Sequence, residues 1–418
     1  MVSDFFYPNL GGVETHIWSL SQCLMQRGHK VIVVTHAFGE RTGVRYMTNG
    51  LKVYYLPVAV VYDQVIFPTL FSFFPVFRNI LIRERISIVH GHQSTSSFAN
   101  ECIMYARTMG YRSCFTEHSL FGFSDSSGIH INQILRALLA DIDHVICVSN
   151  TCRENLVLRA NIHPERVSTI PNAVDPSKFT PDPSKRNPKK TINIVMLSRL
   201  VYRKGIDLAA LVIPLICARF PSVHFIVGGD GPKKIILEEM RERYQLHDRV
   251  ELLGAVPNAA VREVLVRGHI FLNCSLTESF CMALLEASSC GLFVVSTRVG
   301  GVPEVLPPSM IKFAASTTVD DLFLAISEAV VVSRRTVPNE THARIKAMYS
   351  WLNVCQRTEV VYNAMMQSGR PSLGTRFLRH LSSGPIFGVV MCFVVAFMHM
   401  NWCFWDWLYP SKAIERCP

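Results

Sequence analysis

The sequence lacks a CxxC pair and any cluster of cysteine and histidine at zinc-ligand spacing, although it contains 13 cysteines. Small zinc-binding folds are therefore excluded. Charged residues make up only 18% of the chain against 49% hydrophobic residues, which excludes a mainly disordered protein. No basic stretch or long apolar run follows Met1, so no secretory signal is expected. We expect cysteines inside apolar runs, such as Cys147 and Cys274, to be reduced core thiols in a reducing compartment.

At 418 residues the chain is too long for one compact domain. Its 42 basic and 32 acidic residues give a net charge of +10, which favours an anionic partner: nucleic acid, a phosphate-bearing ligand or an anionic membrane face. The basic residues are not concentrated on one recognition module, so a nucleic-acid partner is not expected.

A long apolar segment lies near the C-terminus. Residues 386–408 contain no Lys or Arg, and roughly 20 apolar residues span a bilayer core. We therefore predict one transmembrane helix at 385–409, followed by a short tail at 410–418; a buried or interfacial helix is the alternative. Aromatic residues gather at its end as in a membrane-interface belt: Trp402, Trp405, Trp407 and Tyr409. The arginines upstream place the N-terminal body in the cytoplasm by the positive-inside rule. A GPI-attachment tail also ends apolar, but it requires a translocated protein.

Short β-rich runs alternate with helical stretches along the rest of the chain. Such alternation, with continuous apolar strands, is typical of parallel sheets covered on both faces, so we predict an α/β protein with two doubly wound domains. Ligands of such sheets bind beyond the carboxyl ends of the strands, and two facing domains would place the site in a cleft. The expected strands are Met1–Phe6 (the end of a strand), 30–35, 53–56, 86–90, 114–117, 144–149, 192–197, 224–227, 250–253, 270–273 and 293–296.

A segment with four prolines and five basic residues, 176–190, is the expected linker. The predicted organisation is an N-terminal Rossmann-like, acceptor-side domain at 1–175, the linker at 176–190, a C-terminal Rossmann-like, donor-nucleotide domain at 191–350, and a helical segment at 351–384 before the membrane helix. Residues 65–77 depart from the alternation, with five phenylalanines and two prolines. A core helix and an interfacial membrane contact, the latter supported by Arg78, Arg83 and Arg85, both remain open for it.

Several motifs follow predicted strands at the ligand edge. Gly11-Gly12 opens a helix, whose free N–H groups can face a phosphate, although many such turns are only turns. Arg199, Arg203 and Lys204 follow the strand at 192–197, and two cations there can neutralise a diphosphate without a metal. A solvated basic loop is the alternative.

Two carboxylates form the strongest pattern. Glu278 and Glu286 are separated by seven residues, with Glu278 expected in a loop and Glu286 on the helix that follows. Carboxylates near a polar cleft can each bind vicinal hydroxyls, as sugars require. Two surface glutamates on a helix would be the plain interpretation, but here they accompany the basic loop and a Gly-rich turn at 299–304.

Other motifs are weaker. The turn at 228–232 resembles a nucleotide-binding turn but lacks the full GxGxxG spacing. Asp141 and Asp143 resemble a DxD metal motif but precede their strand, at the wrong edge for the cleft, so no metal is expected there. His118 follows a strand at its carboxyl end, where it can donate to a phosphate or hold a sugar hydroxyl; a core histidine is the alternative. His90 and His92 are similar but less specific.

Together these residues resemble a retaining GT-B glycosyltransferase of the family with the E-x7-E signature, over residues 1–365. The runs VSDFFYPNLGGVETHIWSLSQCL, LVYRKGIDL, ERYQLHDRVELLGA and EVLP are similar to the catalytic subunits of phosphatidylinositol N-acetylglucosaminyltransferases. Family members usually have more residues before Met1, which complete the first strand.

This resemblance implies transfer of N-acetylglucosamine from UDP-N-acetylglucosamine (UDP-GlcNAc) to phosphatidylinositol, the first step of GPI-anchor biosynthesis, with no cofactor and no metal. It implies that Arg199 and Lys204 hold the diphosphate, Gly11 and Gly12 let it approach, Glu286 holds the ribose and Glu278 the donor sugar. His118 would lie near the reacting centre. It further implies a single-pass endoplasmic reticulum membrane protein with its catalytic body in the cytoplasm and other subunits in a complex.

Two alternatives remain open: a transferase of the same fold with another donor, such as a lipid mannosyltransferase, and a membrane-tethered subunit without catalytic activity.

Overall fold

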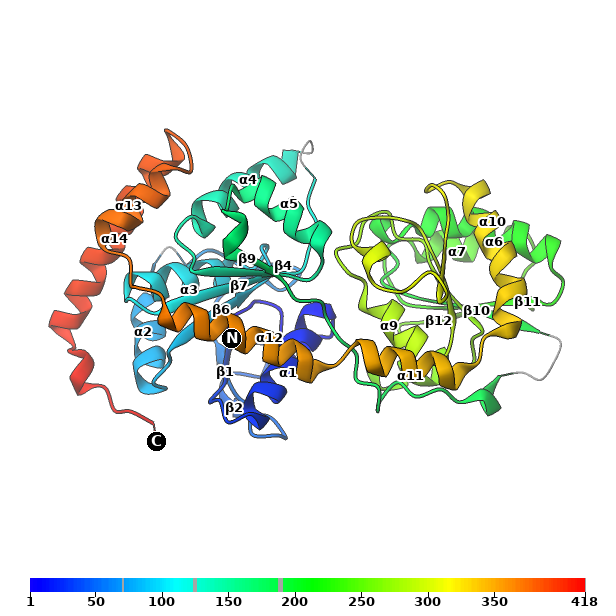
Figure 1. The fold of residues 1–418 in the computed structure, drawn as a ribbon, viewed down its shortest axis with the longest axis horizontal. Helices are drawn as coiled ribbons and strands as arrows, with labels where there is room; N and C mark the ends of the chain where they lie inside the picture. Colours follow the sequence, from blue (N-terminus) through cyan, green and yellow to red (C-terminus); the bar gives the residue numbers. More distant parts are fainter. Residues whose placement is uncertain (70, 123–125, 187–190, 418) are drawn as a thin grey trace. The chain divides into compact units, whose positions relative to one another are not determined.

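The computed structural model describes residues 1–69, 71–122, 126–186 and 191–417, with the backbone alone at 126–130. It divides into two compact units. Unit 1 comprises Met1–Pro171 and Leu352–Pro418, and unit 2 comprises Asn172–Trp351. Each unit contains a parallel sheet with helices packed against it (Figure 1).

Unit 1 begins with an alternation of strands and helices. Its elements are α1 (Gly12–Gln26), β1 (Ile32–His36), β2 (Gly43–Tyr46), β3 (Lys52–Leu56), β4 (Val60–Tyr62), β5 (Val65–Ile66), α2 (Phe74–Arg83), β6 (Ile88–His92), α3 (Ser97–Thr108), β7 (Arg112–Glu117), α4 (Ser126–Leu139), β8 (His144–Cys147), α5 (Asn150–Ala160) and β9 (Val167–Thr169). The predicted strands recur within a few residues. The antiparallel strand β2 and the hairpin β4–β5 were not predicted.

Two groups of strands form the sheet of unit 1, in the orders β1-β3-β2 and β6-β7-β8-β9. Val2 bridges them, because it pairs in parallel with both Val34 of β1 and Gly91 of β6. The expected N-terminal strand is therefore present only as this bridge. With this bridge counted as the first strand, β1, β3, β6, β7 and β8 complete the order 3-2-1-4-5-6 of a doubly wound nucleotide-binding fold, and β2 and β9 extend its two edges. The ligand site of such a fold lies beside the first and fourth strands.

The C-terminal helices return to unit 1: α12 (Trp351–Gln367), α13 (Leu373–Leu381) and α14 (Phe387–Leu408) (Figure 1). One helix among the described residues is long and apolar enough to cross a membrane, α14, with a mean hydropathy of 1.8 and 22% of that window buried. Its buried stripe, Gly388, Met391, Val395 and Met398, recurs every three or four residues. Asp406, its one charged residue, pairs with the buried Arg78 of α2.

The Phe-rich segment 65–77 is not one helix. It begins as β5, and α2 starts only at Phe74. Phe73, Phe74 and Phe77 are buried in the core with Met398 of α14, which supports the core interpretation for this part. Phe67 is 58% exposed, however. Arg78, expected to support a membrane contact, is 1% exposed and donates to Asp406 and to the Tyr409 carbonyl.

Unit 2 holds a six-stranded parallel sheet in the order β12-β11-β10-β13-β14-β15. This is again the order 3-2-1-4-5-6. The predicted strands 192–197, 270–273 and 293–296 recur with the same bounds. The elements are β10 (Ile192–Leu197), α6 (Ile206–Arg219), β11 (Val223–Gly228), α7 (Lys234–Arg243), β12 (Val250–Gly254), α8 (Val261–Leu265), β13 (Ile270–Asn273), α9 (Met282–Ser289), β14 (Phe293–Ser296), β15 (Ile311–Phe313), α10 (Val319–Val332) and α11 (Pro338–Met348).

The segment expected as the linker belongs to unit 2 where it is described. Phe179 is buried, and Arg186 donates to the Gly291 carbonyl at 2.9 Å. Residues 187–190 of this segment lie outside the described part. The strand-flanking cysteines Cys147 and Cys274 are buried in the cores of units 1 and 2, as their apolar surroundings in the sequence predict.

Candidate active site

The switch point of the sheet in unit 2 lies between β10 and β13, which run side by side in parallel. The loop after β10 carries Arg199 and ends in a short 3-10 turn, Tyr202–Lys204. The loop after β13 carries Glu278. Their backbones are joined by a hydrogen bond of 2.8 Å from the Leu276 N–H to the Arg203 carbonyl. The doubly wound topology therefore brings the predicted cations and carboxylates to one edge.

Lys204 and Glu278 form an ion pair at this edge. Ser275 donates a second hydrogen bond of 2.8 Å to the same carboxylate oxygen of Glu278. Burial lowers the pKa of Lys204, but the charge of Glu278, the nearby Cys281 and the hydrogen bond to Glu278 together more than offset it, so the net shift is upward. Lys204 is therefore a fixed cation. The nearby charge of Arg199 acts on Lys204 in the opposite direction, which places both cations in one electrostatic neighbourhood.

Glu286 is the fifth residue of α9. Burial raises its pKa to about 7, with Lys178 acting in the opposite direction. The charges of Glu278, Lys204 and Glu286 all act on the buried thiol of Cys281, which precedes α9. Lys204 thus lies near both Arg199 and Glu278, and Cys281 lies near Lys204, Glu278 and Glu286.

Glycines let the backbone approach closely around the basic loop. Gly205 has φ +66°, and a Cβ there would lie 1.9 Å from the Cys274 carbonyl oxygen. A Cβ at Gly229 would likewise lie 1.9 Å from the Ser198 carbonyl oxygen. The turn at 228–231 therefore supports the loop after β10 by packing, which accounts for its glycines without a bound nucleotide.

The edge of unit 1 carries the Gly11-Gly12 turn at the start of α1. A Cβ at Gly11 would lie 2.5 Å from a carboxylate oxygen of Glu14, which is buried in the first turn of the helix. The Gln64 side chain donates to that carboxylate at 3.4 Å. The carboxylate of Glu14 therefore already occupies the positive, N-terminal end of the α1 dipole. Phosphate approach at this turn stays a prediction, and Glu14 was not singled out from the sequence.

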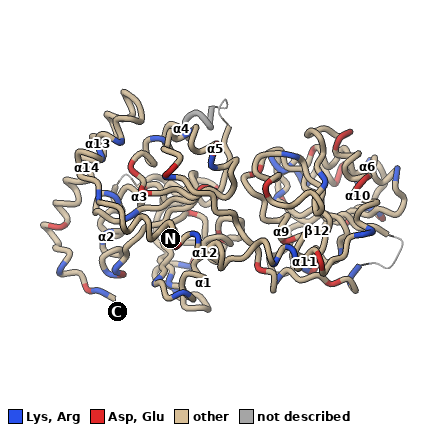
Figure 2. The backbone as a smooth tube through the Cα atoms, in the orientation of Figure 1, with Lys and Arg blue, Asp and Glu red and all other residues tan. Residues whose placement is uncertain are grey.

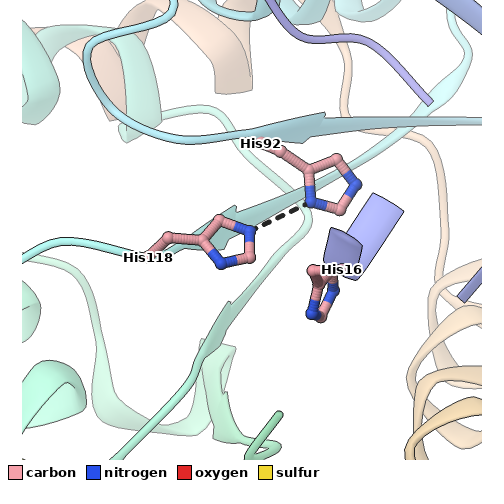
Figure 3. Close-up of side chains that lie close together, drawn as sticks. All are labelled: His16, His92 and His118. Atoms are coloured by element: carbon pink, nitrogen blue, oxygen red, sulfur yellow. Dashed lines mark hydrogen bonds between the residues drawn. The ribbon is translucent and has the colours of Figure 1, made fainter. Parts of the chain in front are cut away.

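Three histidines meet at the same edge, from α1 (His16), the end of β6 (His92) and the loop after β7 (His118) (Figure 3). The His92 Nδ1 and His118 Nε2 atoms are 3.3 Å apart, and the ring of His16 lies 4.7 Å from that of His118. We call these residues the histidine cluster. His16 was not predicted, although three histidines near the ends of neighbouring parallel strands were a signal that could have suggested it.

Burial and the neighbouring imidazoles hold the pKa of His92 and of His118 well below the usual range. Both rings are therefore neutral at physiological pH, so each offers one donor and one acceptor nitrogen. The backbone around His118 is fixed by the buried carboxylate of Glu117, which accepts from the N–H groups of His118 and Ser119 at 3.0 Å. His118 thus presents a neutral imidazole at the ligand edge.

The ligand atoms of the histidine cluster lie within 4.8 Å of one another, and neutral imidazoles suit zinc. This is the one group of potential metal ligands found among the described residues. The expectation of a metal-free site therefore stays a prediction, which a chelator can test.

The DxD pair serves a different purpose. Asp143 pairs with Arg107, and Asp141 with Arg107, Arg376 and Arg379. These ion pairs hold Asp141 against α3 and α13 and Asp143 against α3, so both carboxylates stabilise unit 1 as arginine partners.

Two family models match the chain. Residues 36–125 match PIGA (GPI anchor biosynthesis), and residues 178–330 match glycosyl transferases group 1. A phosphatidylinositol N-acetylglucosaminyltransferase subunit from Arabidopsis thaliana is 54% identical over 100% of this chain and 93% of its own length. The subunit of the same name from Homo sapiens is 52% identical over 99% of this chain and 86% of its own length.

Solved structures share the fold. Sucrose-phosphate synthase from Thermosynechococcus elongatus superposes with a TM-score of 0.74 at 19% identity, covering 86% of this chain and 94% of its own. HepE from Anabaena in complex with UDP and glucose superposes with a TM-score of 0.69 at 16% identity, covering 86% of this chain and 98% of its own. The architecture is thus the GT-B fold predicted from the sequence.

Proposed function

The chain belongs to the family of phosphatidylinositol N-acetylglucosaminyltransferase subunits that includes these Arabidopsis and human proteins, and from this premise we propose that it transfers N-acetylglucosamine from UDP-GlcNAc to phosphatidylinositol with retention of configuration. This reaction opens GPI-anchor biosynthesis. The observation that carries the proposal beyond family membership is the gathering of Arg199, Lys204, Glu278 and Glu286 at the switch point of unit 2.

In unit 2, Arg199 and Lys204 bind the diphosphate and stabilise the negative charge that develops on UDP as it leaves. Lys204 is held by its ion pair with Glu278 before the donor arrives, so little reorganisation opposes its part in this stabilisation. Glu286 accepts hydrogen bonds from the ribose hydroxyls, and Glu278 from the hydroxyls of the donor sugar. The new bond forms between the inositol oxygen and the anomeric carbon as the bond to the diphosphate breaks, and the hydroxyl proton leaves with UDP.

In unit 1, the Gly11-Gly12 turn and the neutral His118 are the proposed contacts near the reacting centre. A neutral imidazole can donate to a sugar hydroxyl without adding a second fixed charge to the site. His92 bonds to His118 at 3.3 Å and so limits the orientation of its ring. These residues position substrate, whereas the cations of unit 2 stabilise charge.

We further propose that the protein resides in the endoplasmic reticulum membrane, anchored by α14, with its catalytic body in the cytoplasm and other subunits bound. The candidate span α14 and the naming of the relatives as subunits support this proposal. Lys and Arg are distributed along both units (Figure 2), which offers no support for a nucleic-acid partner.

The test is transfer by membranes that contain the chain with its partner subunits, using radiolabelled donors and vesicles of phosphatidylinositol. UDP-GlcNAc should give labelled lipid and GDP-mannose should not; the reverse result would reject the proposed donor. Glu278→Ala should abolish transfer without loss of folded protein. Glu328→Ala, which removes an exposed glutamate that pairs with Lys312, is the matched control and should leave transfer unchanged.

A further inference from the structure

Unit 1 carries an exposed apolar finger that no part of the proposed mechanism uses. The hairpin β4–β5 exposes Val60 by 45%, Val61 by 64% and Tyr62 by 79%, and Phe67 beyond it by 58%. Successive side chains of a strand point to opposite faces. All three residues of β4 are exposed, whereas Val65 of β5 is partly buried and Ile66 is buried, so the hairpin is open along β4. The turn between the strands carries one exposed charged residue, Asp63. An exposed group of apolar side chains of this kind marks an interaction site.

The hairpin is fixed beside the ligand edge of unit 1. Ile66 is buried in the same core as Phe73, Phe74 and Phe77, which anchors β5. In the turn, Gln64 donates to Glu14, whose carboxylate lies against Gly11. The hairpin turn, and with it the apolar strand β4, is therefore held next to the Gly11-Gly12 turn. An occupant of this surface would lie beside the proposed substrate contacts.

The same surface continues toward α14. Phe67 donates its N–H to the Ala59 carbonyl, and Phe71 contacts the ring of Phe397 on α14 with centroids 5.5 Å apart. Phe71 is four positions after Phe67, which limits the distance between their Cα atoms to about 14 Å. The outward face of α14 is apolar and exposed as well: Phe393, Phe397, Met400, Phe404 and Trp407. Figure 2 shows α14 almost without charged residues.

We propose that the β4–β5 hairpin inserts into the lipid interface beside α14 and holds the ligand edge of unit 1 on the membrane, so that a lipid headgroup reaches the site without leaving the bilayer. The continuity of this surface with the exposed apolar face of α14, the candidate membrane span, favours lipid as its occupant. Tyr62 at the tip has the amphipathic side chain that is enriched at membrane interfaces. This inference rests on the proposed function, since it concerns how the lipid acceptor arrives.

Apolar insertion, not charge, accounts for this contact. The arginine nearest to the hairpin on α2, Arg78, is buried against Asp406, and Arg83 lies at the far end of that helix, where its side chain contacts Cys417. Contact of the hairpin with lipid should therefore depend little on ionic strength.

The test compares two acceptors with the full complex in membranes: phosphatidylinositol in vesicles and a short-chain phosphatidylinositol dispersed below its micelle concentration. V61D/Y62D should reduce transfer to the vesicle acceptor by about tenfold or more and change transfer to the dispersed acceptor by less than about twofold. The matched control is V44D/Y46D, which changes an exposed Val and Tyr of β2 in the same way and should leave both rates unchanged.

Photoactivatable phosphatidylcholine in the vesicles gives a second readout, because peptides that contact lipid become labelled. The peptide with residues 59–67 should be labelled in the wild type, at low and at high salt alike. No loss of transfer in V61D/Y62D, or equal loss with both acceptors, would overturn the inference. The inference would also be overturned if the hairpin were not labelled by lipid and V61D/Y62D lost its partner subunits, because the surface would then be a protein interface. A wild type inactive with both acceptors would reject the proposed function instead, and the labelling would still decide the role of the hairpin.

Discussion

The ion pair between Lys204 and Glu278 leads to a prediction in which two substitutions act in opposite directions. Without ligand, the Lys204 ammonium is bound to Glu278. A diphosphate that binds the Lys204 ammonium must compete with the Glu278 carboxylate for it. The negative charge of this carboxylate also repels the phosphates. Lys204→Met should therefore weaken UDP binding, and Glu278→Gln should strengthen it.

The magnitudes follow from the geometry. A hydrogen bond to a charged group contributes about 1.5–3 kcal/mol, and partial loss of the Glu278 contact offsets part of it, so Lys204→Met should weaken UDP about tenfold. The phosphates and the Glu278 carboxylate would lie about 6 Å apart on either side of the ammonium, so removing the like charge of Glu278 at an effective dielectric constant of about 40 gives about 1.4 kcal/mol, or roughly tenfold tighter UDP. Transfer should nevertheless fall in both variants, by about 10²-fold to 10³-fold for Lys204→Met, because each side chain also acts on the transition state.

Isothermal titration with UDP, not the sugar nucleotide, is the assay, since Glu278 is proposed to contact only the sugar. Lys234→Met, on an exposed lysine of α7 that pairs with Glu238, is the control and should bind UDP like the wild type. Thermal unfolding should show a loss of about 1–2 kcal/mol for Lys204→Met, between the values of exposed and buried pairs. Changes of UDP affinity in the same direction for both variants, or no change in either, would refute this reasoning.

Three further predictions concern single features. The pKa of Glu286 is raised to about 7 without ligand, and hydrogen bonds from the ribose favour its anion, so UDP binding should release a proton and should tighten about tenfold from pH 6 to pH 8. Glu286→Gln should flatten this pH dependence in titrations at several pH values. A wild type whose UDP affinity does not change with pH would count against a ribose contact. Gly205→Ala combines a φ of +66° with a clash against the Cys274 carbonyl, so it should lower the free energy of unfolding by at least about 3 kcal/mol. Gly254→Ala, at φ +69° with open space around the new Cβ, should lower it by about 1–2 kcal/mol. Equal losses of stability in chemical denaturation would contradict the packing argument. Chelators should leave transfer unchanged, and elemental analysis should find no stoichiometric zinc; activity lost to a chelator and restored by zinc would identify the histidine cluster as a metal site.

The sequence predicts the core of both units well because parallel strands buried on two faces are continuous apolar runs. Residues 192–197, 270–273 and 293–296 are such runs, and their bounds in the structure match the prediction. The convergence of Arg199, Lys204 and Glu278 follows from the same rule, since the carboxyl ends of parallel strands share one edge. For these residues, the local apolar pattern and the topology of the parallel sheet therefore predict the same arrangement.

The features that the sequence did not predict depend on contacts between distant residues. The hairpin at 60–66 is too short for a clear period, and the three residues of β4 are all exposed, so β4 lacks the alternation that identifies a strand. Arg78 meets Asp406 across 328 positions, so the pairing that fixes α14 leaves no local signal. His16 joins the histidine cluster only because α1 packs beside the ends of β6 and β7.

The most direct test of the account is a structure of the complex with UDP bound. We predict the diphosphate within hydrogen-bonding distance of Arg199 and Lys204 at the switch point of unit 2, and the ribose hydroxyls on the carboxylate of Glu286. UDP bound elsewhere, or bound there without contact to either cation, would contradict it.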